Sequence, residues 1–374
     1  MDPINVSDFE ALARERMSTA AFDYYSGAAG DERTLAENRA AFGRITVWPR
    51  VLVDVSRIDT STTVLGQTLS MPIGLAPTAF NKLAHPDGER AAARGAGAAG
   101  TLMTASTIST CTLEETAEAA SGPLWFQLYV YKDRGITREL VARAESAGYS
   151  AIALTVDTPV LGRRERDVRN GFVLPPELSM RNLETCQGVN ADSTRWSAGS
   201  SFSAYVHGLF DTSLSWSAVE WLQSLTRLPV LLKGILRPDD ARRAVEAGVA
   251  GIVVSNHGGR QLDGAPATID ALPPVVSAVE GRIEVLLDGG IRRGVDVLKA
   301  VALGARAVLI GRPYLWALAA AGEDGVKRVL DLLRTELVLA MALAGAPTIR
   351  EITRDLVSTS SDPPGVSVFP ALPR

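Results

Sequence analysis

The chain has 374 residues, of which 46% are hydrophobic and 21% charged, and its formal net charge is −4. This is ordinary globular composition, and a mildly acidic chain gives no electrostatic basis for binding nucleic acid or an anionic membrane. Three histidines and two cysteines (Cys111 and Cys186) argue against a disulfide framework and a metal site, so we expect a reducing, cytoplasmic location. The chain shows no signal peptide and no apolar stretch of about 18 residues that predicts a membrane span.

In chain order, a helical preamble precedes eight predicted strands. The preamble covers residues 1–65, with helices over 7–17 and 34–42. The apolar segments that follow are short, and several are rich in Val, Ile and Leu, as strands buried on both faces are. These segments are 72–77, 101–106, 124–130, 151–159, 229–235, 251–258, 284–291 and 307–313.

Helical segments alternate with these strands. Three with a clear helical period are 137–149, 237–249 and 292–305, and they end near Gly148, Gly248 and Gly304. A final helix is expected over 325–345, before an irregular tail. Eight strand–helix units predict an α/β fold, a (β/α)8 TIM barrel, as one domain over residues 1–374.

Two segments need a separate interpretation. The long connection between strands four and five contains residues 178–210, whose middle is dominated by Ser, Gly and Asn. An insertion of this kind on the active face of a barrel is typical of a mobile lid. The segment GAGAAG (95–100) matches a dinucleotide-binding pattern, but it closes an Ala-rich helix and precedes a strand, which favours helix packing.

Polar side chains occur at the carboxyl ends of nearly all predicted strands, where TIM barrels carry their chemistry. Polarity begins at any strand end, but that does not explain a lysine in VLLKGI, an aspartate in ALTVDTP and a histidine after VVSN. Three titratable groups at equivalent depth favour a functional site. The polar residues at the strand ends are Thr78, Ser106, Gln127, Tyr129, Thr155, Asp157, Lys233, Ser255, His257, Asp288 and Arg312.

The last two predicted units end in glycine-rich segments, DGGIRRG (288–294) and IGRP (310–313). Glycines allow a ligand to approach the backbone N–H groups, and we expect a helix to begin directly after the GG pair. Loops seven and eight of this fold commonly bind phosphate, and Arg292 and Arg312 would add charge-assisted hydrogen bonds. The sequence therefore predicts a phosphorylated ligand.

The other end of that ligand is expected near Lys233 and His257. Arg164 and Arg260 follow strands four and six and are expected to point at the same space. Two arginines beside a histidine suit a carboxylate substrate and a base, with Asp157 orienting the imidazole. The remaining histidines have no such setting and are assigned no role.

Several motifs closely resemble the FMN-dependent α-hydroxy acid oxidases and dehydrogenases, the family of glycolate oxidase, lactate oxidase and mandelate dehydrogenase. The resemblance extends over about residues 5 to 355, and SNHGGRQLD is highly specific to the family. The motifs are YYSGAAGDERTLAENRAAF, FQLYVYKDR, LTVDTPVLGRRERDVRNGF, SNHGGRQLDGAPA and LLDGGIRRGVDVLKAVALGA.

The resemblance implies an FMN in the mouth of the barrel. Backbone at Pro77, Thr78 and Ala79 would back the flavin ring, and Lys233 would stabilise its reduced, anionic form. The edge of the ring and the ribityl chain would bind Ser106, Gln127, Thr155 and Ser255. The phosphate would bind Asp288, Gly290, Arg292, Gly311 and Arg312.

The resemblance also implies a reaction. Tyr24, Tyr129, Arg164 and Arg260 would hold an (S)-2-hydroxy acid, and His257, with Asp157 behind it, would take a proton as two electrons pass to FMN. Transfer of a hydride and formation of a carbanion both remain open. The product would be a 2-oxo acid, and the family suggests a homo-oligomer, a tetramer or octamer.

One position departs from glycolate oxidases, which have a tryptophan over the substrate where this chain has Ile108. A smaller side chain predicts room for lactate, longer acids or mandelates. Ala79 resembles the oxidases, and the chain shows no cytochrome domain or membrane anchor. Oxygen, reduced to hydrogen peroxide, is therefore the expected electron acceptor.

Three alternatives stay open at this point. The first is the same oxidation with an electron acceptor other than oxygen, as in a dehydrogenase. The second is a Schiff-base lyase with Lys233 as the nucleophile, which leaves His257, Arg164 and Arg260 without a role. The third is a barrel that binds FMN without catalysis, against which the intact site argues.

Overall fold

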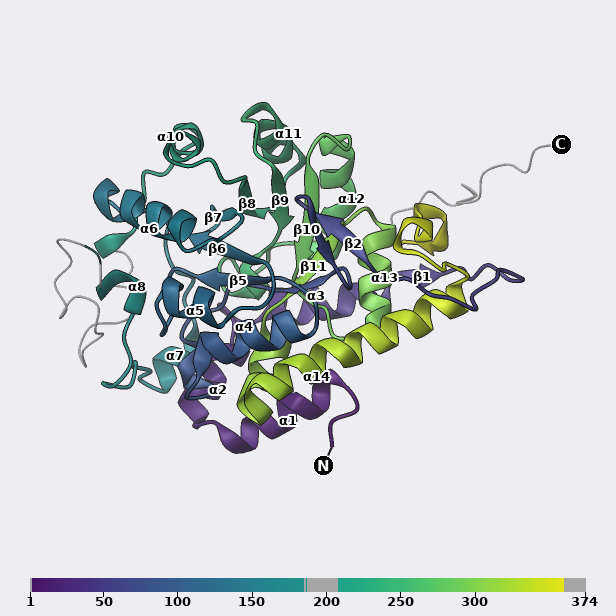
Figure 1. The fold of residues 1–374 in the computed structure, drawn as a ribbon, viewed down its shortest axis with the longest axis horizontal. Coiled ribbons are helices and arrows are strands. Elements are labelled where there is room, and N and C mark those ends of the chain that lie inside the picture. The colour runs from purple at the N-terminus through teal and green to yellow at the C-terminus, as the bar shows by residue number, and fades with distance from the viewer. Residues whose placement is uncertain (1, 185, 187–207, 360–374) are drawn as a thin grey trace.

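The computed structural model describes residues 2–184, 186 and 208–359, in which eight parallel strands close into a barrel surrounded by helices (Figure 1). Each predicted segment contains one of these strands, and β11 pairs with β4 to close the ring, so the (β/α)8 barrel is confirmed. The strands are β4 (Ile73–Leu75), β5 (Met103–Ser106), β6 (Leu124–Leu128), β7 (Ile152–Thr155), β8 (Val230–Ile235), β9 (Gly251–Val254), β10 (Glu284–Asp288) and β11 (Ala307–Ile310).

The barrel interior is a packed apolar core. It contains side chains from successive strands, among them Trp125, Leu231 and Leu286, while outward-facing residues pack against the helices. The hairpin of β2 (Thr62–Val64) and β3 (Gln67–Leu69) lies at the amino ends of the strands, where Gln67 accepts a hydrogen bond from the Trp125 indole at 3.3 Å. Because the interior is filled, space for a ligand lies at the carboxyl ends.

The predicted helices correspond to observed ones. The segments 237–249 and 292–305 contain α11 and α13, and 137–149 overlaps α6, which begins earlier, at Arg134. The predicted final helix is the second half of α14, which bends at Ala321 and Gly322. GAGAAG closes α4, and a Cβ on Gly95 would lie 2.7 Å from Cβ of Val326, so helix packing is confirmed. The barrel helices are α4 (Gly88–Ala98), α5 (Leu113–Ala119), α6 (Arg134–Ser146), α10 (Ser217–Leu225), α11 (Pro238–Glu246), α12 (Thr268–Val279), α13 (Gly294–Ala302) and α14 (Arg312–Ala344).

The preamble is helical only as far as Gly43. It contains α1 (Val6–Arg16), which lies along α14 (Figure 1), then α2 (Thr19–Ser26) and α3 (Arg33–Gly43). The segment from there to residue 65 is irregular apart from β1 (Thr46–Val47), which pairs with β12 (Val357–Ser358), and β2. The prediction of a helical preamble with helices over 7–17 and 34–42 is confirmed, and the structure adds α2 between them.

The connection after β7 contains the short helices α7 (Glu165–Arg169) and α8 (Arg181–Glu184). The predicted lid, 178–210, lies mostly outside the described residues, which resume at 208. Among the helices that the structure describes, none combines the length and apolar character that crossing a membrane requires.

The glycine pair Gly289–Gly290 is required by the preamble. Both residues have positive φ, 94° and 84°, and a Cβ on Gly290 would lie 2.0 Å from the backbone oxygen of Asn38 in α3. The expectation that a helix begins directly after this pair is wrong, because α13 begins at Gly294. Asp296 accepts hydrogen bonds from the backbone N–H groups of residues 292 and 293, so that helix end is already capped.

We expect Gly290→Ala to lower the free energy of unfolding more than Gly248→Ala. Gly248 also has positive φ, 68°, but a Cβ there meets nothing within 4 Å. Both substitutions incur about 1–2 kcal/mol of left-handed backbone strain, and only the first adds overpacking, typically about 1–3 kcal/mol. Urea unfolding of both variants measures the difference. Equal losses in the free energy of unfolding would show that α3 shifts to accommodate the new Cβ without a loss of stability.

Candidate active site

A cavity opens at the carboxyl ends of the strands and encloses about 1080 Å³, part of it open to solvent. Its lining combines apolar side chains with convergent polar and charged groups, as is typical of small-molecule and cofactor sites. Asp157 and Ser255 lie behind its wall, and the other predicted site residues line it. The lining residues among them are Tyr24, Pro77, Thr78, Ala79, Ser106, Ile108, Gln127, Tyr129, Thr155, Arg164, Lys233, His257, Arg260, Asp288, Gly290, Arg292, Gly311 and Arg312.

The cavity also has lining residues that sequence reasoning missed. Tyr25 follows Tyr24 in α2, and both rings are buried, so the two neighbours reach the cavity together. Phe210 stacks on Tyr129 with ring centroids 4.5 Å apart, but it fell inside the supposed lid. The inward alternation of β11 could have identified Leu309, and no sequence pattern marks Leu161.

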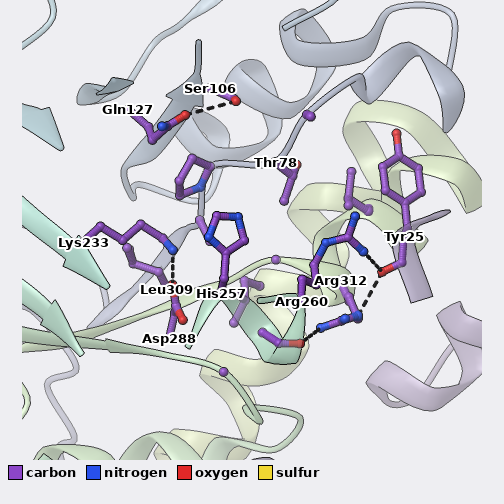
Figure 2. Close-up of a pocket in the computed structure, with 18 of the residues that line it drawn as sticks. Tyr25, Thr78, Ser106, Gln127, Lys233, His257, Arg260, Asp288, Leu309 and Arg312 are labelled. Carbon is purple, nitrogen blue, oxygen red and sulfur yellow. Dashed lines mark hydrogen bonds and ion pairs between the residues drawn. The ribbon is translucent and has the colours of Figure 1, made fainter. Parts of the chain in front are cut away.

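His257 projects into the middle of the cavity. Figure 2 shows its imidazole between the Lys233–Asp288 pair and a group formed by Arg260, Arg312 and Tyr25. The residue has φ of 57°, and its backbone N–H donates to Ser255 Oγ at 3.1 Å. A non-glycine residue in this left-handed region is held there by its surroundings.

Asp157 orients the imidazole. Its Oδ1 lies 3.0 Å from His257 Nδ1 and also accepts a hydrogen bond from Thr158 Oγ1 at 3.0 Å. With the proton of the neutral ring on Nδ1, Nε2 keeps a free lone pair. The arrangement therefore holds the ring as a base whose imidazolium form is stabilised by a carboxylate.

Burial and charge decide the protonation of this pair. Burial lowers the pKa of His257, and Lys233 and Arg164 lower it further against the opposing charge of Asp157. Burial acts to raise the pKa of Asp157, but His257 and Lys233 outweigh it and hold that pKa below its usual value. The resting pair is thus a neutral imidazole beside a carboxylate.

Lys233 is a buried cation with a buried partner. Its Nζ lies 3.1 Å from Asp288 Oδ2 and donates to Ser255 Oγ at 3.0 Å. Burial acts to lower the pKa of Lys233, but Asp288 and Asp157 reverse the effect and raise it. The ammonium group therefore remains charged at neutral pH.

The polar wall between β5 and β7 is built around Gln127. Its Oε1 accepts hydrogen bonds from Ser106 Oγ and from the Thr107 N–H, both at 3.2 Å, and its Nε2 donates to Thr155 Oγ1 at 3.0 Å. Three neighbouring strands thus present hydrogen-bonding groups to one side of the cavity.

The opposite wall is strongly cationic. Arg312 donates from Nε to the backbone oxygen of Tyr25 at 2.9 Å and from Nη2 to that of Gly27 at 2.8 Å, at the C-terminal end of α2. Arg260 donates from Nη1 to the backbone oxygen of Tyr24 at 2.6 Å. Burial, followed by the charge of Arg164, lowers the pKa of Arg260 to about 10. Concentrated, desolvated positive charge favours an anionic ligand.

Two further guanidinium groups are incompletely satisfied. Within the described part of the chain, the buried Nε atoms of Arg164 and Arg292 have no hydrogen-bond partner. Burial, followed by the charge of Arg39, lowers the pKa of Arg292 to about 10, and its guanidinium lies 5.0 Å from the centre of the Trp316 ring. Both residues line the cavity, so acceptor atoms on a bound ligand would supply the missing hydrogen-bond partners.

We expect His257 to titrate below its usual value of about 6.5, so that the ring is neutral at pH 7 and gains its proton only at lower pH. Asp157→Asn removes a charge that raises this pKa, so the pKa should fall further. Titration of the His257 ring protons by NMR in the wild type and the variant measures both values. A pKa above the usual value, or an increase in the variant, would contradict the assignment of causes.

The chain was compared with known proteins. A family model described as FMN-dependent dehydrogenase matches residues 13–359. Glycolate oxidase 3 of Arabidopsis thaliana is 55% identical over 97% of this chain and 98% of its own length. Glycolate oxidase of Spinacia oleracea is 54% identical over the same shares of the two chains.

Solved structures also match this chain over most of its length. Mandelate oxidase with (S)-4-hydroxymandelic acid matches with a TM-score of 0.90 at 46% identity, covering 96% of this chain and 99% of that one. Mandelate oxidase alone matches with a TM-score of 0.87 at 45% identity, covering 96% of this chain and 98% of that one. The chain therefore belongs to the FMN-dependent dehydrogenase family.

Proposed function

We propose that this protein oxidises an (S)-2-hydroxy acid to the 2-oxo acid, with FMN as cofactor and oxygen reduced to hydrogen peroxide. The observation that carries the proposal is one cavity in which a neutral His257, backed by Asp157, faces Arg164 and Arg260. A base beside paired guanidinium groups suits a substrate that carries a hydroxyl next to a carboxylate.

The cavity fits FMN. The unsatisfied Nε of Arg292 and the N-terminus of α14, which begins at Arg312, offer donors to a phosphate. A Cβ on Gly311 would meet only ordinary contacts, the nearest at 3.6 Å from Thr78, so this glycine leaves room beside that helix end. We assign the phosphate to Gly290, Arg292, Gly311 and Arg312.

The remaining cofactor contacts follow from the walls described above. Lys233 lines the cavity as a charged group, while Asp288 and Ser255 hold its ammonium, so we assign those two residues a role through Lys233. The flavin ring is assigned to the polar wall and to the loop after β4. These residues are Ser106, Gln127, Thr155, Pro77, Thr78 and Ala79.

When bound, FMN accepts two electrons from the substrate. Arg164 and Arg260 hold the substrate carboxylate by paired N–H donors, which fixes the hydroxyl-bearing carbon. His257 takes a proton from the substrate at Nε2, and Asp157 stabilises the resulting imidazolium. Burial raises the pKa of Tyr129, so its phenol stays protonated and donates a hydrogen bond to the substrate.

Tyr24, in α2, donates a second hydrogen bond to the substrate. Burial raises the pKa of Tyr24, so this phenol also stays protonated.

The charge on Lys233 distinguishes this reaction from that of a Schiff-base lyase. A Schiff-base lyase needs a neutral amine as nucleophile, but the raised pKa of Lys233 keeps its ammonium charged. The charge instead suits a site that stabilises negative charge on a reduced cofactor.

Flavin reduction in the absence of oxygen tests the function. The purified protein should contain FMN, and a 2-hydroxy acid should bleach it, with peroxide formed when air is admitted. His257→Ala should retain FMN and lose about 10²–10⁴-fold in the rate of bleaching. His85→Ala is the matched control, since that histidine lies outside the cavity.

A colourless protein that cannot be reconstituted with FMN would refute the proposal. Normal bleaching in His257→Ala would place the base elsewhere. Bleaching by the acid without peroxide formation in air would favour the dehydrogenase alternative and a different electron acceptor.

Ile108 is proposed to determine the size of the substrate. Its side chain is 5% exposed and lines the cavity beside the loop after β4, where Phe80 donates its N–H to the Ile108 oxygen at 3.1 Å. An apolar wall of this size favours apolar substrate atoms by about 0.8 kcal/mol, or about fourfold, for each buried CH2.

We therefore expect kcat/KM for (S)-lactate or (S)-mandelate to exceed that for glycolate, and Ile108→Trp to shift the ratio toward glycolate. The expected change is only a few-fold to about tenfold for one methyl group, because apolar pockets discriminate weakly. Steady-state peroxide formation with each acid measures the ratio. A wild-type enzyme that prefers glycolate over every larger acid would contradict the assignment and leave the role of His257 intact.

A further inference from the structure

Glu89 is a fully buried carboxylate that the proposed mechanism does not use. It lies in the first turn of α4, on the outside of the barrel, with 0% of the residue exposed. A buried carboxylate is costly unless its oxygens are satisfied by donors. Glu89 lies behind two loops that line the cavity, and its hydrogen-bond donors come from these loops.

The carboxylate binds both loops at once. Oε1 accepts from the N–H of Asn81 at 3.1 Å and from the N–H of Thr110 at 2.9 Å. Oε2 accepts from Thr110 Oγ1 at 2.7 Å and from the N–H of Cys111 at 3.0 Å. Asn81 belongs to the loop after β4, and residues 110 and 111 belong to the loop after β5.

Thr110 adds a second bridge between the same loops. Its Oγ1, which donates to Glu89, also accepts a hydrogen bond from the N–H of Lys82 at 3.1 Å. The loops are joined directly by the N–H of Phe80 and the backbone oxygen of Ile108. Phe80 has φ of 58°, so this part of the first loop is held in a left-handed conformation.

We propose that Glu89 is a positioning residue that sets substrate selectivity. It fixes the separation between Ala79 and Ile108, which line the cavity from these two loops. Ile108 precedes the clamped residues 110 and 111, and Ala79 precedes the clamped residue 81. The inference deepens the proposed function and rests on it, because Ile108 is assigned to the side chain of the hydroxy acid and Ala79 to the flavin ring.

Glu89→Gln tests the clamp with little change in volume. A carboxylate presents two acceptor oxygens, whereas the amide presents one oxygen and one NH2 group. Thr110 Oγ1 can turn to accept from the new NH2 group, but a backbone N–H facing that group loses its acceptor. Thr110→Val is the milder second variant, since it removes the hydroxyl bridge and keeps the carboxylate.

Glu115→Gln is the matched control. Glu115 caps α5 by accepting from the N–H of Thr112 at 2.9 Å, next to the clamped residues, and in the described part of the chain it has no hydrogen bond to the loop after β4. All three variants change one hydrogen-bonding group at the same loop. Only the first two loosen the connection between the loops.

The measured quantity is the ratio of kcat/KM for a larger acid to that for glycolate, per bound flavin. Glu89→Gln should lower kcat/KM for the preferred acid about tenfold or more, with a smaller fall for glycolate, so that the ratio changes. Thr110→Val should change the ratio in the same direction, and Glu115→Gln should leave it unchanged. Hydrogen exchange in the flavin-free protein should quicken in both segments, 77–83 and 107–112, for the first two variants only.

The outcomes separate this inference from the proposed function. If the wild type oxidises 2-hydroxy acids and both clamp variants keep its selectivity ratio, Glu89 is structural and the inference is wrong. An equal change in Glu115→Gln would also overturn it. If the wild type oxidises no 2-hydroxy acid, the proposed function fails, and the exchange pattern still reports whether Glu89 joins the loops.

Discussion

The cost of burying positive charge is the constraint on which the site depends. Arg164, Arg260, Arg292 and Arg312 all line one cavity, and burial is the largest cause of the lowered pKa of the last three. The backbone oxygens at the end of α2 offset part of this cost, because the C-terminal end of a helix carries partial negative charge. The positive charge that stays uncompensated favours an anionic ligand, and a phosphate or a carboxylate would supply the missing negative charge.

This constraint explains why the preamble is part of the site. Most of the oxygens that bind Arg260 and Arg312 belong to Tyr24, Tyr25 and Gly27, which precede the first strand of the barrel, and Gly258 supplies one more to Arg312. Asn38 of α3 exchanges two hydrogen bonds with Asn256, the residue before His257. The barrel supplies the ends of its strands, and the helices of the preamble hold the charged groups there in register.

The sequence was sufficient to predict the barrel and most of the lining residues. Strands buried on both faces leave a continuous apolar pattern, and the fold places chemistry at their carboxyl ends, so Lys233, His257 and Asp288 could be identified from local sequence. Family motifs added Tyr24 and Ile108, which no periodicity marks. What escaped prediction depends on contacts between distant segments. Glycine is required at position 290 because a Cβ there would clash with a backbone oxygen of α3. The hydrogen bonds of Glu89 form only because the fold places the loops after β4 and β5 beside α4.

The left-handed backbone at His257 has a consequence for the evolution of this chain. A non-glycine residue in that region gives up conformational stability, and glycine would occupy it more readily. Selection for stability alone would therefore favour replacing the very residue that is assigned as the base. The position assigned to the base is thus one where side-chain chemistry and backbone stability favour different residues.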